Sequence, residues 1–233
     1  MSHAARKAAA AEFRQHIRRS NELHESYLAA PGQAEQYDRF TEWQMAYLLT
    51  YFVDLHEKPG YGEAIDFTIS DLAGASISHR DRDLERASPV FTRMLPVRAL
   101  ETLAAAAKLN VRVLQVNLGV FRHLQSDHEL PAEISERSYC EAFRETSTLD
   151  ECTDMVNLAT DLGGTLKTLV KVPLLGAMLR GMRVPAHAAG YGALHEFLER
   201  GYTNFKAIPD IEHFLAEIDA RMTEVFEIIF TAP

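Results

Sequence analysis

The amino-acid sequence predicts an all-α protein, and three observations lead to this prediction. Apolar residues recur at the spacing that places them on one face of a helix, and they do so over long segments. The 12 glycines and 9 prolines fall mainly between these segments. No series of short segments alternates apolar and polar residues, as half-buried strands would. Because no linker or repeat divides the chain, we expect residues 1–233 to form a single domain, a bundle of about eight to ten helices.

The expected helices of the N-terminal half end at prolines, glycines or polar connections. The first covers residues 2–28 and stops before Pro31-Gly32, and we expect this basic segment, residues 1–30, to pack peripherally. Its basic residues are Arg6, Lys7, Arg14, Arg18 and Arg19. Further helices are expected at residues 36–57, 62–72, 84–95 and 97–125.

The helices of the C-terminal half have clearer start signals. Pro131 marks one expected start, and residues 147–151 form overlapping capping boxes for a helix that reaches Lys171. Pro173 and Pro185 should divide the next stretch into two shorter helices, of which the second ends at Gly201. The last helix starts at residues 208–210 and has a regular apolar stripe of Ile211, Phe214, Leu215, Ile218, Met222, Val225, Phe226 and Ile229.

Composition argues against several classes of protein. The chain has 24 Lys+Arg and 33 Asp+Glu, whereas nucleic-acid binding relies on a basic surface, so we expect no nucleic-acid partner. No segment has the roughly 18 apolar residues of a transmembrane helix, and the first residues lack the apolar core of a secretory signal. Cys140 and Cys152 are too far apart for a redox motif or a zinc knuckle. Two buried thiols in a reducing cytoplasm are therefore expected.

Sequence patterns typical of catalysis are absent. We find no nucleophile elbow, P-loop or dinucleotide-binding glycine pattern. Asp210-x-x-His213 is a single copy with Asp, whereas di-iron bundles use two Glu-x-x-His pairs. One expected helical edge offers weak metal-ligand candidates and should face solvent or another subunit. Its residues are His187, Tyr191, His195 and Glu199. The sequence thus identifies no catalytic residue, and any cofactor stays unknown.

Two features are unusual enough to suggest a binding site. His79-Arg80-Asp81-Arg82-Asp83 places five consecutive ionisable residues in a connection, where Arg80 and Asp81 either tie two helices together or contact a ligand. From Leu162 to His195 the chain has no Asp or Glu, although its overall composition would place about five there. This segment carries Lys167, Lys171, Arg180 and Arg183, interleaved with Leu169, Val172, Leu174, Leu175, Met178, Leu179 and Met182.

The acid-free segment allows three interpretations. It can be ordinary core whose cations extend outward to water. It can bind a small anionic or amphipathic ligand, with the cations on the head group. It can also contact a protein partner or rest on an anionic membrane surface.

The chain resembles a family of uncharacterised bacterial proteins named after an FFLEELY motif. The residues that carry the resemblance are Phe67-Thr68-Ile69-Ser70-Asp71-Leu72-Ala73-Gly74, Arg80-Asp81, Leu95-Pro96, Ala99-Leu100, Leu179-Arg180, Met182-Arg183, Pro185-Ala186, Ala189-Gly190 and Phe197-Leu198-Glu199-Arg200-Gly201. Thr68, Ser70 and Ala73 depart from the second Phe, first Glu and Tyr of the motif. The resemblance extends from Tyr37 onward and implies a bacterial helical protein with no assigned reaction.

The leading hypothesis is a non-enzymatic cytoplasmic helical protein, expected to be a homodimer, that binds an anionic or amphipathic ligand or a partner through residues 162–195. The alternative is a heme-oxygenase-like helical enzyme, proposed by analogy of fold alone. Its metal or heme would be held by side chains from separate helices, with His24, His56, Asp71, His195 and Glu199 as candidates. A third hypothesis is an interaction module whose basic N-terminal helix docks on an acidic partner.

Overall fold

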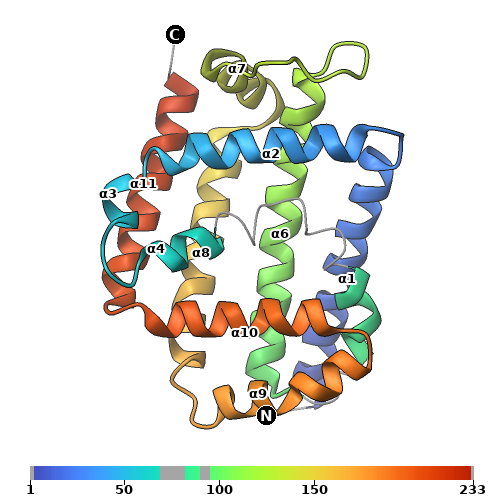
Figure 1. The fold of residues 1–233 in the computed structure, drawn as a ribbon, viewed down its shortest axis with the longest axis vertical. Helices are drawn as coiled ribbons and strands as arrows, with labels where there is room; N and C mark the ends of the chain where they lie inside the picture. Colours follow the sequence, from blue (N-terminus) through green and yellow to red (C-terminus); the bar gives the residue numbers. More distant parts are fainter. Residues whose placement is uncertain (1–2, 69–81, 90–94, 232–233) are drawn as a thin grey trace.

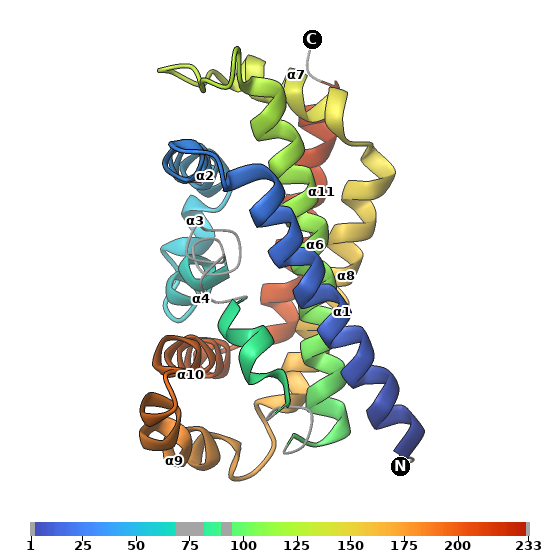
Figure 2. The same ribbon diagram turned by 90° about the vertical axis from the view of Figure 1, so that its right-hand side faces the viewer.

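Long helices lie side by side in one layer of the molecule, and shorter helices cross them in a second layer (Figure 1). The computed structural model describes residues 3–68, 82–89 and 95–231. The long layer consists of α1 His3–Leu28, α6 Val97–Leu124, α8 Leu149–Leu169 and α11 Ile211–Thr231. The crossing layer contains α2 Gln33–Leu49, α3 Val53–His56, α4 Gly62–Asp66, α9 Leu175–Ala188 and α10 Gly192–Ala207. Figure 2 shows the two layers edge-on, and no strand occurs in the described ranges. The predicted all-α fold is therefore confirmed.

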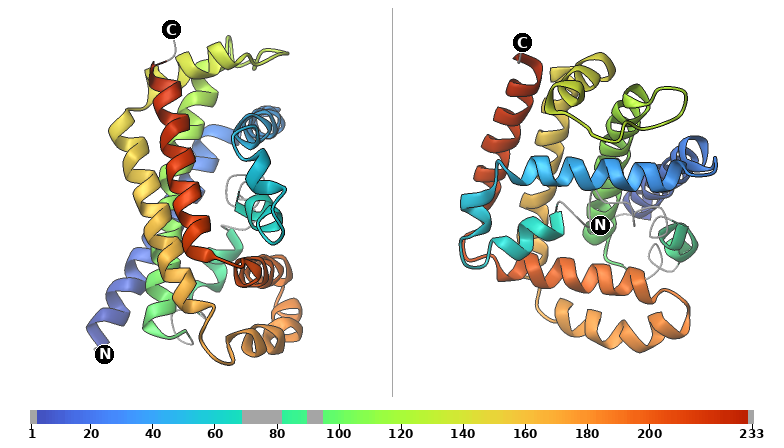
Figure 3. Two further views of the ribbon diagram at one scale, coloured as in Figure 1. Left: turned by 90° about the vertical axis from the view of Figure 1, so that its left-hand side faces the viewer. Right: turned by 45° about the horizontal axis from the view of Figure 1, so that its top comes forward.

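Apolar helix faces hold the two layers together. α1 packs along α6 and buries Phe13 and Ile17, which join Leu100 and Leu194 in one cluster. α8 and α11 pack side by side (Figure 3). A larger cluster forms where α2 crosses the long layer beside α7 Glu136–Thr146, and it is rich in aromatic rings. Its aromatic members include Tyr37, Phe40, Phe121, Tyr139, Phe143 and Phe226. Cys140 and Cys152 are both buried here as free thiols.

Helix boundaries with capping chemistry agree with the sequence. Thr148 and Glu151 form a capping box at the start of α8, as predicted. α11 begins as expected after Asp210, whose Oδ1 accepts the backbone N–H of His213 at 3.0 Å. The predicted stripe of α11 faces the core, with Phe214, Val225, Phe226 and Ile229 buried. Local sequence therefore determines these boundaries.

The single helix predicted for residues 36–57 is wrong, because the structure separates it into α2 and α3. The backbone leaves the helical path at Phe52, and the Tyr51 carbonyl accepts a hydrogen bond from Arg221 Nη1 at 2.9 Å. The same guanidinium donates to both carboxylate oxygens of Asp54, at 2.5 and 2.9 Å. A contact from α11 thus stabilises an interruption that the apolar pattern of residues 36–57 does not show.

Three predictions based on proline or glycine are also wrong. α7 starts at Glu136 rather than at Pro131, since Ser135 caps it in a box with Ser138. α9 continues through Pro185, and the hydrogen bond that proline cannot donate is the one to Gly181, which is an exposed residue. α10 continues through Gly201, which lies so close to Phe67 that a Cβ atom would be 2.8 Å from the ring. Gly201 therefore allows close packing and does not end the helix.

Two expected helices are described only in part. α4 ends at Asp66, and the remainder of predicted helix 62–72 beyond residue 68 lies outside the described residues. Residues 82–89 are helical, which covers part of predicted helix 84–95, whereas Leu95 is not helical. Within the described chain, no helix combines the length and apolar character needed to cross a membrane.

Candidate functional site

The acid-free segment lies at one end of the molecule. It runs from the second half of α8 through the α8–α9 connection and α9 into the first turn of α10 (Figure 1). Lys171, Arg180 and Arg183 are exposed and have no hydrogen-bond or ion-pair partner among the described residues. Lys167 instead forms an ion pair with Glu212 at the start of α11. Three of the four cations predicted from the segment are therefore available to a ligand.

A groove of about 800 Å³ opens beside this segment, and we call it the α8–α10 groove. Lys167, Lys171 and Arg180 line it together with Lys206 from α10, whose ammonium lies 5.4 Å from the centre of the Tyr202 ring. Apolar walls come from both sides of the α8–α9 connection and from the α10–α11 junction. They include Val170, Val172, Leu174, Ile208 and Ile211. Arg183, also predicted for this site, does not line the groove.

Lys206 and Tyr202 are site residues that the sequence reasoning missed. Both lie on α10 beyond Glu196, the first acid after the acid-free segment, so a run without acids does not include them. A signal does exist, because Tyr202 and Lys206 are four residues apart and thus share one face of a helix. The close contact of α9 with α10 brings that face to the predicted cations, and a Cβ on Gly176 would lie 2.9 Å from the Tyr202 ring.

The outward face of α9 is apolar, which is unusual for an exposed helix. Its exposed apolar residues, which we call the α9 face, are Leu174, Ala177, Met178, Gly181, Val184, Pro185 and Ala188. Arg180, Arg183 and His187 are the other exposed residues of α9. Leu174 and Val184 are 80% and 78% exposed. Four of the six large apolar side chains that are exposed in the described ranges lie within residues 172–184, namely Val172, Leu174, Met178 and Val184.

Leu174 also has an unfavourable backbone conformation. Its φ of 69° lies in the left-handed region, which costs a residue with a Cβ about 1 kcal/mol or more. The residue occupies the N-cap position of α9 and makes no side-chain capping bond. Neither local conformation nor burial therefore explains a leucine at this position.

The family of the protein can be stated from a comparison with family models. Residues 23–233 match the model described as a domain of unknown function, DUF8198. The chain belongs to this family. Comparisons with curated proteins and with solved structures found no match. The DUF8198 match includes the whole α9 face and the α8–α10 groove.

Within this DUF8198 chain, the expected solvent-facing stripe is wrong at His195. His195 is only 4% exposed, and its Nε2 lies 2.7 Å from the carbonyl oxygen of Leu179. Its Nδ1 is buried without a hydrogen bond to the described residues and lies 3.9 Å from Glu199 Oε2. His187 lies on α9 rather than on the same helix, and its Nε2 is 3.4 Å from Glu196 Oε1. The contact of His195 with the Leu179 carbonyl thus links α10 to the backbone of α9.

The remaining candidate residues of the DUF8198 chain are dispersed. His24 is buried on α1, and His56 Nε2 lies 2.8 Å from Asp66 Oδ1 at another place. Asp71, Arg80 and Asp81 lie outside the described residues. Over the described ranges, no three His, Cys, Asp or Glu side chains come together as metal ligands would. The helical-enzyme hypothesis therefore gains no assembled site from these residues.

Proposed function

We propose that this protein binds anionic lipid surfaces through the α9 face and the cations beside it. The single observation that carries the proposal is the exposure of Leu174 and Val184 on a helix without acidic residues. An interfacial helix of this kind places its apolar side chains below the lipid head groups and its cations among them. A contiguous exposed apolar patch of this kind indicates a binding surface.

Charge and position favour a lipid surface over a soluble partner. Lys171, Arg180 and Arg183 flank the α9 face, and each cation near an anionic membrane contributes about 1 kcal/mol to binding. α9 lies at the outer end of the molecule, so it can meet a flat surface without obstruction by the long helices (Figure 2). Two buried free thiols suit a reducing compartment, and we therefore place the contact at a cytoplasmic membrane surface.

Vesicle co-sedimentation tests this proposal. We expect the protein to bind vesicles that contain phosphatidylglycerol, to ignore vesicles of phosphatidylcholine alone, and to dissociate as the salt concentration rises. The double variant Lys171→Glu/Arg183→Glu should bind at least about tenfold more weakly, since two cations become anions. Leu174→Asn should also weaken binding. Because Asn tolerates the left-handed conformation, this variant should fold as well as the wild type, and the loss would come from the missing apolar side chain.

Matched controls separate this contact from general effects. Val53→Gln removes an apolar side chain that is 55% exposed on α3, and it should leave vesicle binding unchanged. Undiminished binding of the Lys171→Glu/Arg183→Glu variant would contradict the proposal. Saturable binding of monomeric dodecyl phosphate without any binding to vesicles would contradict it too, and would assign the α8–α10 groove to a single soluble amphiphile. The expected homodimer stays a prediction, and sedimentation velocity of the protein without lipid measures its oligomeric state.

A further inference from the structure

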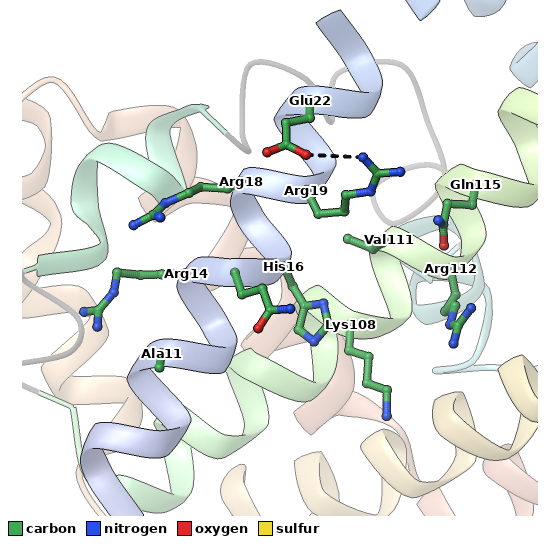
Figure 4. Close-up of a pocket in the computed structure, with 11 residues that line it drawn as sticks. Ala11, Arg14, His16, Arg18, Arg19, Glu22, Lys108, Val111, Arg112 and Gln115 are labelled. Carbon is green, nitrogen blue, oxygen red and sulfur yellow. Dashed lines mark hydrogen bonds and ion pairs between the residues drawn. The ribbon is translucent and has the colours of Figure 1, made fainter. Parts of the chain in front are cut away.

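A second groove, lined mainly by polar and basic side chains, lies between α1 and α6 in the long layer. Its volume is about 730 Å³. We call it the basic groove, because its lining includes five Arg and Lys side chains and a single carboxylate, Glu22. The five cations are Arg14, Arg18, Arg19, Lys108 and Arg112. Figure 4 shows Arg19, Lys108 and Arg112 on the side where α1 faces α6, with Arg14 and Arg18 extending from the other side of α1. The ring of His16 lies beside Lys108 in the same view.

The cations of the basic groove are poorly neutralised by the protein itself. Arg14, Lys108 and Arg112 have no hydrogen-bond or ion-pair partner in the described part of the chain. Arg19 Nη1 lies 3.2 Å from Glu22 Oε2, and Arg18 Nε lies 3.8 Å from Glu85 Oε1. Both pairs are largely exposed, and such pairs contribute little to stability. The groove therefore keeps a positive potential although the whole chain carries a net charge of −9.

The spacing of these cations works against helix stability. Lys108 and Arg112 are four residues apart on α6, and Arg14 and Arg18 are four residues apart on α1. Like charges at this spacing destabilise a helix by about 0.2–0.5 kcal/mol per pair. The packing of α1 on α6 uses other residues, among them Ala9, Phe13 and Ile17. Folding alone therefore does not account for the Lys108–Arg112 pair, whose repulsion an anion bound beside it would relieve.

We infer that the basic groove binds a small molecule carrying two or three phosphate groups. Arginine forks bind phosphate oxygens in pairs, and the side of the groove where α1 faces α6 offers Arg19 and Arg112 together with Lys108. Gln15 and Gln115, which also line the groove, add neutral donors. Ala11 and Val111 are the apolar lining residues, so the groove lacks the anchors that an acidic peptide would use. Its volume suits a ligand of limited size.

A long nucleic acid fits this groove poorly. Such a polyanion would extend past the groove onto a negatively charged surface, because the chain outside the groove lining has 19 Lys and Arg against 32 Asp and Glu. Nucleic-acid binding depends on many phosphate contacts along a continuous basic surface. A compact anion instead neutralises the positive charge of the groove without reaching the acidic surface beyond it.

Isothermal titration calorimetry with sodium tripolyphosphate tests the inference. The wild-type protein should bind one tripolyphosphate in a saturable, salt-sensitive manner. Lys108→Ala/Arg112→Ala should weaken binding at least about tenfold, since each lost cation removes charge-assisted hydrogen bonds. This variant removes a repulsive pair, so its melting temperature should not fall. The matched control Lys58→Ala/Arg98→Ala removes two exposed cations that line neither groove, and it should bind tripolyphosphate as the wild type does.

Three results would overturn the inference. The first is no saturable heat with tripolyphosphate. The second is equal affinity of the wild type and the Lys108→Ala/Arg112→Ala variant when both are folded. The third is tighter binding of a duplex DNA or an acidic peptide than of tripolyphosphate with the same dependence on Lys108 and Arg112, which would assign the groove to a macromolecule. None of these results bears on vesicle binding by the α9 face, so the two proposals can fail separately.

Discussion

At the scale of a single residue, the pKa of His16 depends on the charges in and around the basic groove. Burial lowers the pKa of His16 below 6.5, and Lys108 and Arg112 lower the pKa further, whereas Glu12 raises it. Glu12 Oε1 lies 3.9 Å from His16 Nε2, too far for a strong hydrogen bond. A bound polyanion would offset the two cations, and the pKa of His16 should then rise.

This coupling predicts proton uptake by His16 when tripolyphosphate binds. Without ligand, the unfolded chain binds a proton at His16 more readily than the native protein, so native stability decreases as the pH falls below 6.5. Ligand binding raises the native pKa, and binding should therefore strengthen as the pH falls toward 6. Calorimetry in buffers of different ionisation enthalpy measures the uptake. His16→Gln is the reference, because the ligand's own protonation is common to both proteins. Equal proton uptake by the two would contradict the prediction.

The two cysteines show a residue property that the sequence predicted well. Cys140 and Cys152 are 2% and 0% exposed. Burial raises the pKa of Cys152 to about 12 and also raises the pKa of Cys140. Composition and spacing were sufficient here, because isolated cysteines without a motif are usually buried. His195 behaved differently, since its burial depends on the path of α9 above it, which no local pattern specifies.

At the scale of elements, adjacent glycines on α8 give a matched pair of substitutions. A Cβ on Gly163 would lie 2.3 Å from Leu215 Cδ2 of α11, whereas a Cβ on Gly164 would have no neighbour within 4 Å. Gly164→Ala should therefore stabilise the protein by about 0.5–1 kcal/mol through lower backbone entropy in the unfolded chain. Gly163→Ala should destabilise it by about 1–2 kcal/mol, because Leu215 must move.

Urea unfolding of both alanine variants measures this difference. Their free energies of unfolding should move in opposite directions from the wild type with unchanged denaturant slope. Equal stability of the two variants would show that α8 and α11 are not in close contact at Gly163. The variants carry the same added methyl group at adjacent positions of one helix, so helix propensity cannot cause the difference.

Element boundaries were predictable where their cause is local. The Thr148–Glu151 capping box and the cap at Asp210 lie within a few residues of the helix starts that they define. The break between α2 and α3 has a distant cause, because Arg221 of α11 binds the Tyr51 carbonyl across the two layers. Proline likewise failed as a boundary marker at Pro185, which lies inside α9 with one backbone hydrogen bond fewer.

At the scale of the whole molecule, the two candidate sites differ in how far the sequence revealed them. The α9 face follows from one continuous segment, so its missing acids and its cations could be counted along the chain. The basic groove combines α1 with α6, whose residues are far apart in the sequence. The basic character of α1 was visible, but Lys108 and Arg112 join it only through the packing of the long layer. Composition therefore predicts a site confined to one segment better than a site between two.

The separation of these sites leads to a final prediction about the whole protein. The α9 face belongs to the crossing layer, whereas two helices of the long layer form the basic groove (Figure 2). Both sites can therefore be occupied at the same time. Tripolyphosphate at a saturating concentration should not release the protein from phosphatidylglycerol vesicles, and Lys108→Ala/Arg112→Ala should bind these vesicles as the wild type does.

Sodium sulfate of equal ionic strength is the control for this experiment, because salt alone weakens exposed electrostatic contacts. Release by tripolyphosphate beyond the effect of sulfate, together with loss of vesicle binding in the Lys108→Ala/Arg112→Ala variant, would show that the basic groove itself contacts lipid phosphates. Release with normal vesicle binding by that variant would instead mean that ligand binding in the long layer alters the α9 face. Independent binding is expected because α9 contacts mainly α10, and α10 separates it from the groove between α1 and α6.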